Sequence, residues 1–252
     1  MCDIFALSAG VNYTAQQYLP IFAEKGKQNM SGWGIGFFRD NQALIEKSSE
    51  KVYDGEQVHG SFQRLARVVD SRIIVSHISC PLSGGRHTAH NHPFSLSFLD
   101  HVWLFVHVGV IDGIADYQTT NEPRIDVDVY PARVFEYLRD QLISYLRYTP
   151  YGSLGRSLVK SIRNMLSEYP GRYAFVLANE SVLFAFCNFR QFMLLRQSES
   201  VGNSLVLTSI KEGLSDNEWI SISPEKNTLG KLLVAAGPDV LYLGDVAQGS
   251  LL

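Results

Sequence analysis

The sequence is poor in the features that mark several large classes of protein. Its 252 residues contain only three cysteines, too few and too scattered for a disulfide framework or a zinc ribbon: Cys2, Cys80 and Cys187. No apolar run is long enough to predict a membrane-spanning helix, and the N-terminus shows no signal peptide. These absences predict a cytoplasmic protein that has no membrane partner.

An excess of charge of either sign is also missing. The chain has 22 Lys and Arg against 25 Asp and Glu, a net charge of −3, so we expect no nucleic acid partner. Repeats, low-complexity tracts and flexible linkers are absent as well. With 46% hydrophobic and 19% charged residues, the composition is typical of a globular protein, and we expect a single domain that spans residues 1–252.

What is present is a pattern of short strands at both ends of the chain with helices between them. Apolar or alternating segments predict strands at 3–9, 72–79 and 102–111, a hairpin at 31–49, and several strands in the last third. The spacing of apolar residues predicts helices at 14–25, where Pro20 limits the length, and at 58–70, 128–148 and 152–169. Because strands and helices do not alternate strictly, the pattern favours an α+β fold over a doubly wound α/β fold.

The residue behind the start methionine has a chemistry that depends on its position. If Met1 is removed, Cys2 carries a thiol and a free α-amine, whose unperturbed pKa of about 7.7–8.0 lets it act as a base near neutral pH. A nucleophile that carries its own base needs no separate histidine. The alternative is a small apolar residue at the start of a strand, and position alone favours this second interpretation.

Five short motifs occur in order along the first half of the chain: MCDIFALS (1–8), GWGIGFF (32–38), SHI (76–78), NHPF (91–94) and FVHVG (105–109). This series resembles the class II glutamine amidotransferases, in particular the small stand-alone members that begin with Met-Cys. The resemblance covers essentially the whole chain. It implies an N-terminal-nucleophile (Ntn) hydrolase fold, a four-layer α-β-β-α sandwich with two stacked, mainly antiparallel sheets.

The resemblance also implies roles for individual residues. Cys2 is the expected nucleophile with its own α-amine as the base, and the backbone N–H of Gly109 is expected to stabilise the oxyanion. The family's aspartate that binds the substrate α-amine falls at Asp126 or Asp128, and we take Asp128. The other expected substrate-binding positions are Trp33, Ser79, His92 and Val108. The resemblance implies no cofactor.

Two of these positions depart from the family pattern. Where the family has His-x-Arg, whose arginine grips the α-carboxylate of glutamine, this chain has Ser79, and a neutral hydroxyl cannot replace a bidentate cation. Where the family has His-Asn-Gly, this chain has Val108, which has no donor for an oxyanion. Losing one such donor typically costs about 10²–10³ in rate. Compact, uncharged residues at both positions favour a larger or less charged ligand than glutamine.

Two functions stay open on these grounds. The first is an amidohydrolase in which Cys2 attacks a carboxamide, of glutamine or of a related γ-glutamyl or amide compound, and releases ammonia or an amine. Any ammonia acceptor would then lie on a separate synthetase subunit, because the domain fills the chain. The second is a catalytically inactive protein of the same fold with a binding or regulatory role. A homo-oligomer is compatible with both.

A metal site is the third and least favoured alternative. The stretch RHTAHNHPF (86–94) places His87, His90 and His92 close together, and imidazole is a common zinc ligand. No Asp, Glu or Cys stands at ligand spacing within this stretch, and the resemblance already accounts for His92. We therefore predict that no metal is bound.

Overall fold

The computed structural model describes residues 2–25, 32–79, 91–127, 129–147, 153–197, 203–210 and 218–247. Within these residues the strands form two sheets, and every neighbouring pair of strands is antiparallel. None of the helices in these ranges is both long enough and apolar enough to cross a membrane.

The N-terminal strand lies in the middle of the larger, seven-stranded sheet. The order across this sheet is β11 (Trp219–Ile222), β9 (Phe192–Arg196), β10 (Ser204–Thr208), β1 (Asp3–Thr14), β4 (Asp70–Ile78), β2 (Trp33–Arg39) and β3 (Gln42–Ser48). β2 and β3 form the predicted hairpin, which turns at Asp40 and Asn41.

The second sheet has six strands, and most of them follow one another in the chain. Their order is β13 (Asp239–Asp245), β12 (Lys231–Ala236), β8 (Leu183–Cys187), β7 (Gly171–Ala178), β6 (His101–Ile111) and β5 (Phe94–Phe98). In the described residues between β6 and the next helix, the chain forms a 3-10 turn at Ile114–Asp116.

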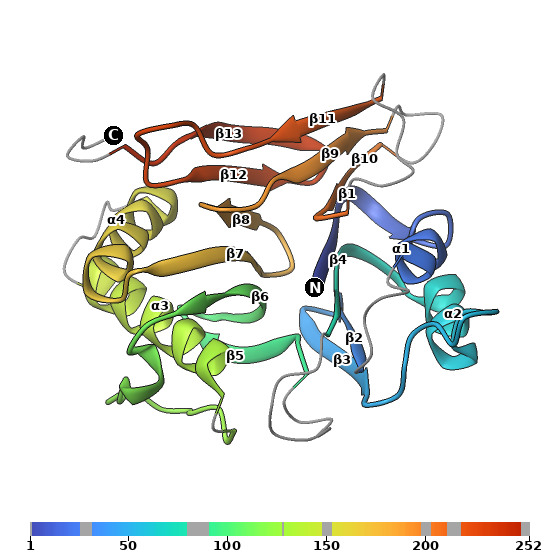
Figure 1. Cartoon of the computed structure of the whole chain (residues 1–252), viewed down its shortest axis with the longest axis horizontal. Helices are drawn as coiled ribbons and strands as arrows, with labels where there is room; N and C mark the ends of the chain where they lie inside the picture. The colour runs from blue at the N-terminus through green and yellow to red at the C-terminus, as the bar shows by residue number, and fades with distance from the viewer. Residues whose placement is uncertain are drawn as a thin grey trace.

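Helices cover the outer faces of the two sheets (Figure 1). α1 (Leu19–Lys25) and α2 (Gly60–Val68) pack on the seven-stranded sheet, and α3 (Tyr130–Arg147) and α4 (Leu154–Glu168) pack on the six-stranded sheet. The inner faces of the sheets pack against each other through a third apolar cluster. The layers are therefore α-β-β-α, which confirms the predicted α+β sandwich.

The alternation of side chains along β1 explains how one strand serves two layers. Phe5 and Leu7 point outward to the helix-facing core, whereas Ile4 and Ala6 point into the core between the sheets. Apolar residues at both kinds of position make β1 a continuous apolar segment, as a strand buried on both faces requires. α1 starts at Leu19, later than predicted, because Pro20 stands in the first turn, where a helix tolerates it.

Candidate active site

Strand ends meet at the start of β1. Asp3 is opposite Ile78 at the end of β4, and Ile78 is in turn opposite Trp33 at the start of β2. β1 also contacts β6, β7 and β12 of the other sheet, and its dark-blue start is marked N in Figure 1. Cys2 is half-buried and packs against the core between the sheets, which includes Val108 near the end of β6. The structure thus places Cys2 and Val108 in the same packed layer.

Arg190, in the segment between β8 and β9, holds the start of the chain. Its Nη1 donates to the carbonyl oxygen of Cys2 at 2.5 Å, and its Nη2 donates to Oδ1 of Asp3 at 2.9 Å. The Ser209 hydroxyl donates to the same Asp3 oxygen at 3.1 Å and accepts from the N–H of Ile4 at 2.9 Å. These bonds fix the backbone of Cys2, and no sequence motif pointed to Arg190.

The backbone of Gly109 is turned away from its neighbour β7. Its opposite residue, Tyr173, bonds instead to Asn188, through its N–H at 2.7 Å and its carbonyl at 2.9 Å. Since the two residues of an antiparallel pair both face each other or both face away, the N–H of Gly109 points to the far side. There β5 begins at Phe94, opposite Phe105, so among the described residues no strand pair of β5 and β6 extends as far as Gly109. We expect its N–H to be available to a ligand.

The phenol of Tyr130, the first residue of α3, reaches the same glycine. Its hydroxyl donates to the carbonyl oxygen of Gly109 at 2.7 Å, and its ring meets the His107 ring edge-on with centroids 6.0 Å apart. Two causes raise the pKa of Tyr130 to about 12: burial, which is the larger, and the electrostatic interaction with Cys2. Tyr130 therefore keeps its proton at neutral pH and lies within electrostatic reach of Cys2. Sequence motifs did not indicate this residue either.

Ser79 is buried, and its hydroxyl is already engaged. It donates to Oδ1 of Asn91 at 3.0 Å and lies 3.3 Å from Nδ1 of His77. The Asn91 amide in turn donates to the carbonyl of Ser48 at 2.8 Å. Ser79 thereby ties the end of β4 to the segment before β5 and to the end of β3, and it brings no charge to the site.

Three histidines near these residues are buried and neutral. The rings of His77 and His92 lie against each other with centroids 4.4 Å apart, whereas His107 stands on the helix-facing side of β6. Burial is the main cause that lowers their pKa values, to about 3 for His77 and His107 and well below 6.5 for His92. The positive charges of Arg190 and Lys47 lower the pKa of His77 further.

Trp33 and Gly34 show how the GWGIGFF motif divides between two faces. The Trp33 ring packs toward α2, with its centroid 5.2 Å from that of Phe62, and belongs to the helix-facing core. Gly34 faces the other sheet, where a Cβ atom would collide with the carbonyl of His92. The glycine therefore lets the NHPF segment lie on β2. The structure does not bring the Trp33 ring together with Cys2.

A family model of class II glutamine amidotransferases matches residues 1–206 of the chain. The chain belongs to this family. A curated relative is 29% identical over 122 residues: the γ-glutamyl-hercynylcysteine sulfoxide hydrolase of Mycolicibacterium smegmatis. An uncharacterized protein of Methanocaldococcus jannaschii is 24% identical over 118 residues. These matches span 48% and 47% of this chain but only 51% and 32% of the two relatives.

Solved structures of class II amidotransferases share the fold. A predicted glutamine amidotransferase from Pseudomonas aeruginosa superimposes with a TM-score of 0.63 at 18% identity, covering 96% of this chain and 100% of that one. Glutamine phosphoribosylpyrophosphate amidotransferase from B. subtilis gives a TM-score of 0.63 at 12% identity, covering 98% of this chain and 50% of that one. The similarity confirms the Ntn-type sandwich and the small stand-alone type of this amidotransferase-family chain.

Some of the residues that the sequence analysis singled out lie outside the described residues. These are Asp128 and, for the metal alternative, His87 and His90, while the alternative Asp126 is exposed. Among the residues that the structure describes, no group of three or more His, Cys, Asp and Glu side chains could hold a metal ion. Of the predicted site residues, the structure places Cys2 and Val108 in the core between the sheets, and Ser79 and His92 each beside His77.

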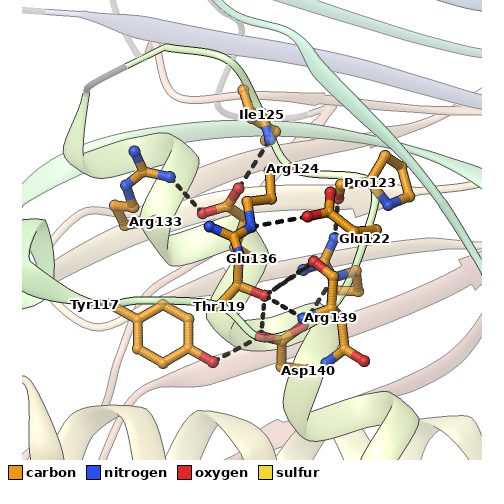
Figure 2. Close-up of polar contacts among 11 residues, drawn as sticks. Tyr117, Thr119, Glu122, Pro123, Arg124, Ile125, Arg133, Glu136, Arg139 and Asp140 are labelled. Atoms are coloured by element: carbon orange, nitrogen blue, oxygen red, sulfur yellow. Dashed lines mark hydrogen bonds and ion pairs between the residues drawn. The ribbon is translucent and has the colours of Figure 1, made fainter.

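The segment between β6 and α3 of this amidotransferase-family chain is anchored by a buried arginine (Figure 2). Arg139 on α3 is fully buried and donates to the carbonyls of Asn121 and Pro123 and to the hydroxyl of Thr119. Its Nε donates to Asp140 at 2.8 Å, and Thr119 donates to that carboxylate as well. One cation thus satisfies several acceptors of a segment that has little regular structure.

A buried glutamate one turn earlier on α3 extends the same anchor. Glu136 accepts from the backbone N–H of Ile125 at 2.8 Å and from Nη1 of Arg133 at 2.7 Å, as Figure 2 shows. The segment up to Ile125 is therefore bonded to α3, the helix that carries Tyr130 at its start. We expect this anchoring to keep the Tyr130 hydroxyl at a constant position beside Gly109.

Proposed function

We propose that this chain is an amidohydrolase whose nucleophile is Cys2 and which releases an amine or ammonia from a γ-glutamyl amide. The observation that carries the proposal is the placement of Cys2 at the start of the central strand, held at its carbonyl by Arg190. The N–H of Gly109, which points away from β7 to a side where the described part of β5 does not reach, supports the proposal as an oxyanion donor. Membership of the class II glutamine amidotransferase family supports it as well.

The reaction uses groups that Cys2 itself carries once Met1 is removed. The α-amine takes the thiol proton, the sulfur attacks the carbonyl carbon, and the oxyanion accepts from the N–H of Gly109. When the C–N bond breaks, the α-ammonium gives the proton to the leaving amine, and the acyl group stays on the sulfur as a thioester. Water then attacks the thioester with the α-amine as base, which releases the carboxylic acid and restores the thiol.

The preference for a substituted γ-glutamyl amide over free glutamine rests on the lack of a positive charge at Ser79, where the family has an arginine. Its hydroxyl is bonded to Asn91, so a glutamyl carboxylate lacks the bidentate partner that an arginine would provide. A larger amine part can add contacts that compensate for this weaker hold. The Mycolicibacterium smegmatis relative is named as a hydrolase of a γ-glutamyl compound, which favours the same substrate class.

The alternative is a catalytically inactive protein that binds a ligand at the same place. It is favoured by Val108, a buried side chain without a donor, and by the neutral Ser79. Under this alternative Cys2 is only a packing residue of the layer between the sheets.

Amide hydrolysis by the whole chain, after removal of Met1, separates the two functions. The protein is incubated with L-glutamine and with a series of γ-glutamyl amides, and free glutamate and amine are measured. We expect release of both products by the wild type, with substituted amides preferred, and no release by Cys2→Ala. Cys187→Ala is the matched control, because burial raises the pKa of this thiol to about 12 and keeps it unreactive. Product release by the wild type that does not exceed release in buffer alone, for every amide, would establish the inactive alternative.

We add a location and a partner to the proposal. We infer a cytoplasmic protein and, where the leaving group is ammonia, a synthetase subunit on another chain that accepts it. Simple hydrolysis of substituted amides needs no such subunit. Full activity of the isolated chain with a substituted amide, and little with glutamine, is the outcome that supports an independent hydrolase.

A further inference from the structure

The departure at Val108 removes one of the two oxyanion donors that the family motif supplies. Val108 is buried in the core between the sheets and has no polar atom in its side chain. A lone backbone N–H, that of Gly109, would then have to stabilise the whole negative charge of the tetrahedral intermediate. One missing donor lowers the rate by about 10²–10³, so an active enzyme with this sequence needs a donor from elsewhere.

We propose that the hydroxyl of Tyr130 is the second donor of the oxyanion hole. The inference rests on the proposed amidohydrolase function and adds a catalytic residue to it. The hydroxyl lies 2.7 Å from the carbonyl oxygen of Gly109. The N–H and C=O of one strand residue point to the same side, so the Tyr130 hydroxyl and the Gly109 N–H lie on the same side of β6. Cys2 is within electrostatic reach of the same hydroxyl.

The position of Tyr130 is well determined in the fold, as an oxyanion donor requires. Its ring packs edge-on against His107 at one end of α3. Further along the helix, Glu136 and Arg139 bond to the segment that precedes it. The hydroxyl therefore needs no large movement to reach an oxyanion beside Gly109. Only the O–H bond rotates, from the Gly109 carbonyl to the new negative oxygen.

The chemistry of a phenol suits this role. Tyr130 keeps its proton at neutral pH, because its pKa is raised to about 12, mainly by burial. An anionic oxygen is a stronger acceptor than a neutral carbonyl, so the hydroxyl shifts its hydrogen bond when the sulfur attacks. The bond returns to the Gly109 carbonyl when the tetrahedral intermediate collapses. No proton is transferred to or from Tyr130 over the cycle.

The test compares Tyr130→Phe with the wild type on the γ-glutamyl amide that the wild type hydrolyses best. We expect kcat to fall by about 10²–10³ while KM changes little, because the lost bond forms only in the transition state. Tyr173→Phe is the matched control, since it removes a hydroxyl that donates to the Tyr169 carbonyl at 2.6 Å in the same aromatic cluster. Its kcat is expected to equal that of the wild type.

A second measurement separates a catalytic role from a structural one. A γ-glutamyl aldehyde adds to the Cys2 thiol and forms a hemithioacetal. The S–C bond forms, the carbonyl carbon becomes tetrahedral, and the thiol proton passes to the former carbonyl oxygen. We expect Tyr130→Phe to weaken binding of this aldehyde by more than tenfold and to leave the thermal midpoint of unfolding near that of the wild type. If aldehyde binding weakens by the same factor by which KM rises, Tyr130 does not act as an oxyanion donor and has only a packing role.

The outcomes also separate this inference from the function on which it rests. If the wild type hydrolyses the amide and Tyr130→Phe has the same kcat, the donor role of Tyr130 is wrong and the amidohydrolase stands. If the wild type and Cys2→Ala are equally inactive on every amide, the amidohydrolase is wrong, and the donor role is wrong with it.

Discussion

Arg190 connects the start of the chain to a segment 188 residues away and so determines where Cys2 lies. The guanidinium is largely buried and bonds to the Cys2 carbonyl and the Asp3 carboxylate. Hydrogen bonds to charged groups contribute about 1.5–3 kcal/mol to stability, more than neutral ones. If Cys2 is the first residue of the mature chain, as we propose, it has only one neighbour in sequence, so its position depends on such bonds.

Replacing Arg190 by methionine tests this connection. We expect Arg190→Met to lower the free energy of unfolding by about 1.5–3 kcal/mol, because the Asp3 carboxylate loses its cation. We also expect kcat to fall about tenfold or more, because a misplaced nucleophile is costly. Denaturant unfolding at pH 7 and steady-state kinetics are the measurements. Arg196→Met, an exposed arginine on β9, is the control and should stay within about 0.5 kcal/mol of the wild type. Equal stability of the two variants would rule out the anchoring role.

At the scale of elements, α3 is more than a cover for the six-stranded sheet. Its buried Arg139 and Glu136 bond to backbone groups of the segment between β6 and α3 and add to that segment's own backbone hydrogen bonds (Figure 2). Breaking a buried pair by removing one partner is strongly destabilising, because the other charge stays buried without compensation. An exposed pair in the same segment, Arg124 and Glu122 at 3.1 Å, provides the contrast.

The two arginines should differ sharply when each is replaced by methionine. We expect Arg139→Met to lower the free energy of unfolding by about 3–5 kcal/mol, since the Asp140 carboxylate and the segment's carbonyls lose their donor. Arg124→Met should cost less than about 1 kcal/mol, because its pair with Glu122 is screened by water. Chemical denaturation of both variants is the measurement, and similar losses in the two would contradict the assigned importance of burial.

The sequence motifs predicted the secondary-structure elements and the family better than they predicted which face of a sheet each side chain occupies. The alternation in GWGIGFF predicts a strand, but it does not say which of Trp33 and Gly34 faces the other sheet, and that depends on the packing of the His92 segment. Arg190 and Tyr130 escaped prediction for a different reason. Each acts on a residue far away in the sequence, and such contacts leave no local pattern.

At the scale of the whole molecule, the sandwich holds three neutral histidines in its interior. His77 and His92 lie between the sheets' ends, and His107 lies under α3. Each is neutral when folded and takes up a proton in the unfolded chain below its usual pKa of 6.5. Their contribution to stability is therefore fully present above pH 6.5 and is lost as the pH falls, toward about 3 for His77 and His107.

The pH dependence of unfolding tests this contribution. Each such histidine adds about 1.4 kcal/mol per pH unit to the slope of stability against pH in this window. We expect His107→Phe, which keeps an aromatic ring between its neighbours, to reduce the slope between pH 6 and pH 5 by about that amount. Val106→Ala is the control, because it weakens the core without removing a titrating group and should keep the wild-type slope. A slope that is the same in His107→Phe and the wild type would contradict a buried neutral His107.

The central claim, that Cys2 is a working nucleophile, is tested most directly by intact-mass measurement. The protein from its native host is mixed with a γ-glutamyl amide, the reaction is quenched in acid, and the mass of the intact chain is measured by mass spectrometry. We predict a chain that lacks Met1 and carries one γ-glutamyl group, which hydroxylamine removes and which Cys2→Ala never acquires. A chain that retains Met1, or that gains no acyl group through Cys2, would contradict it.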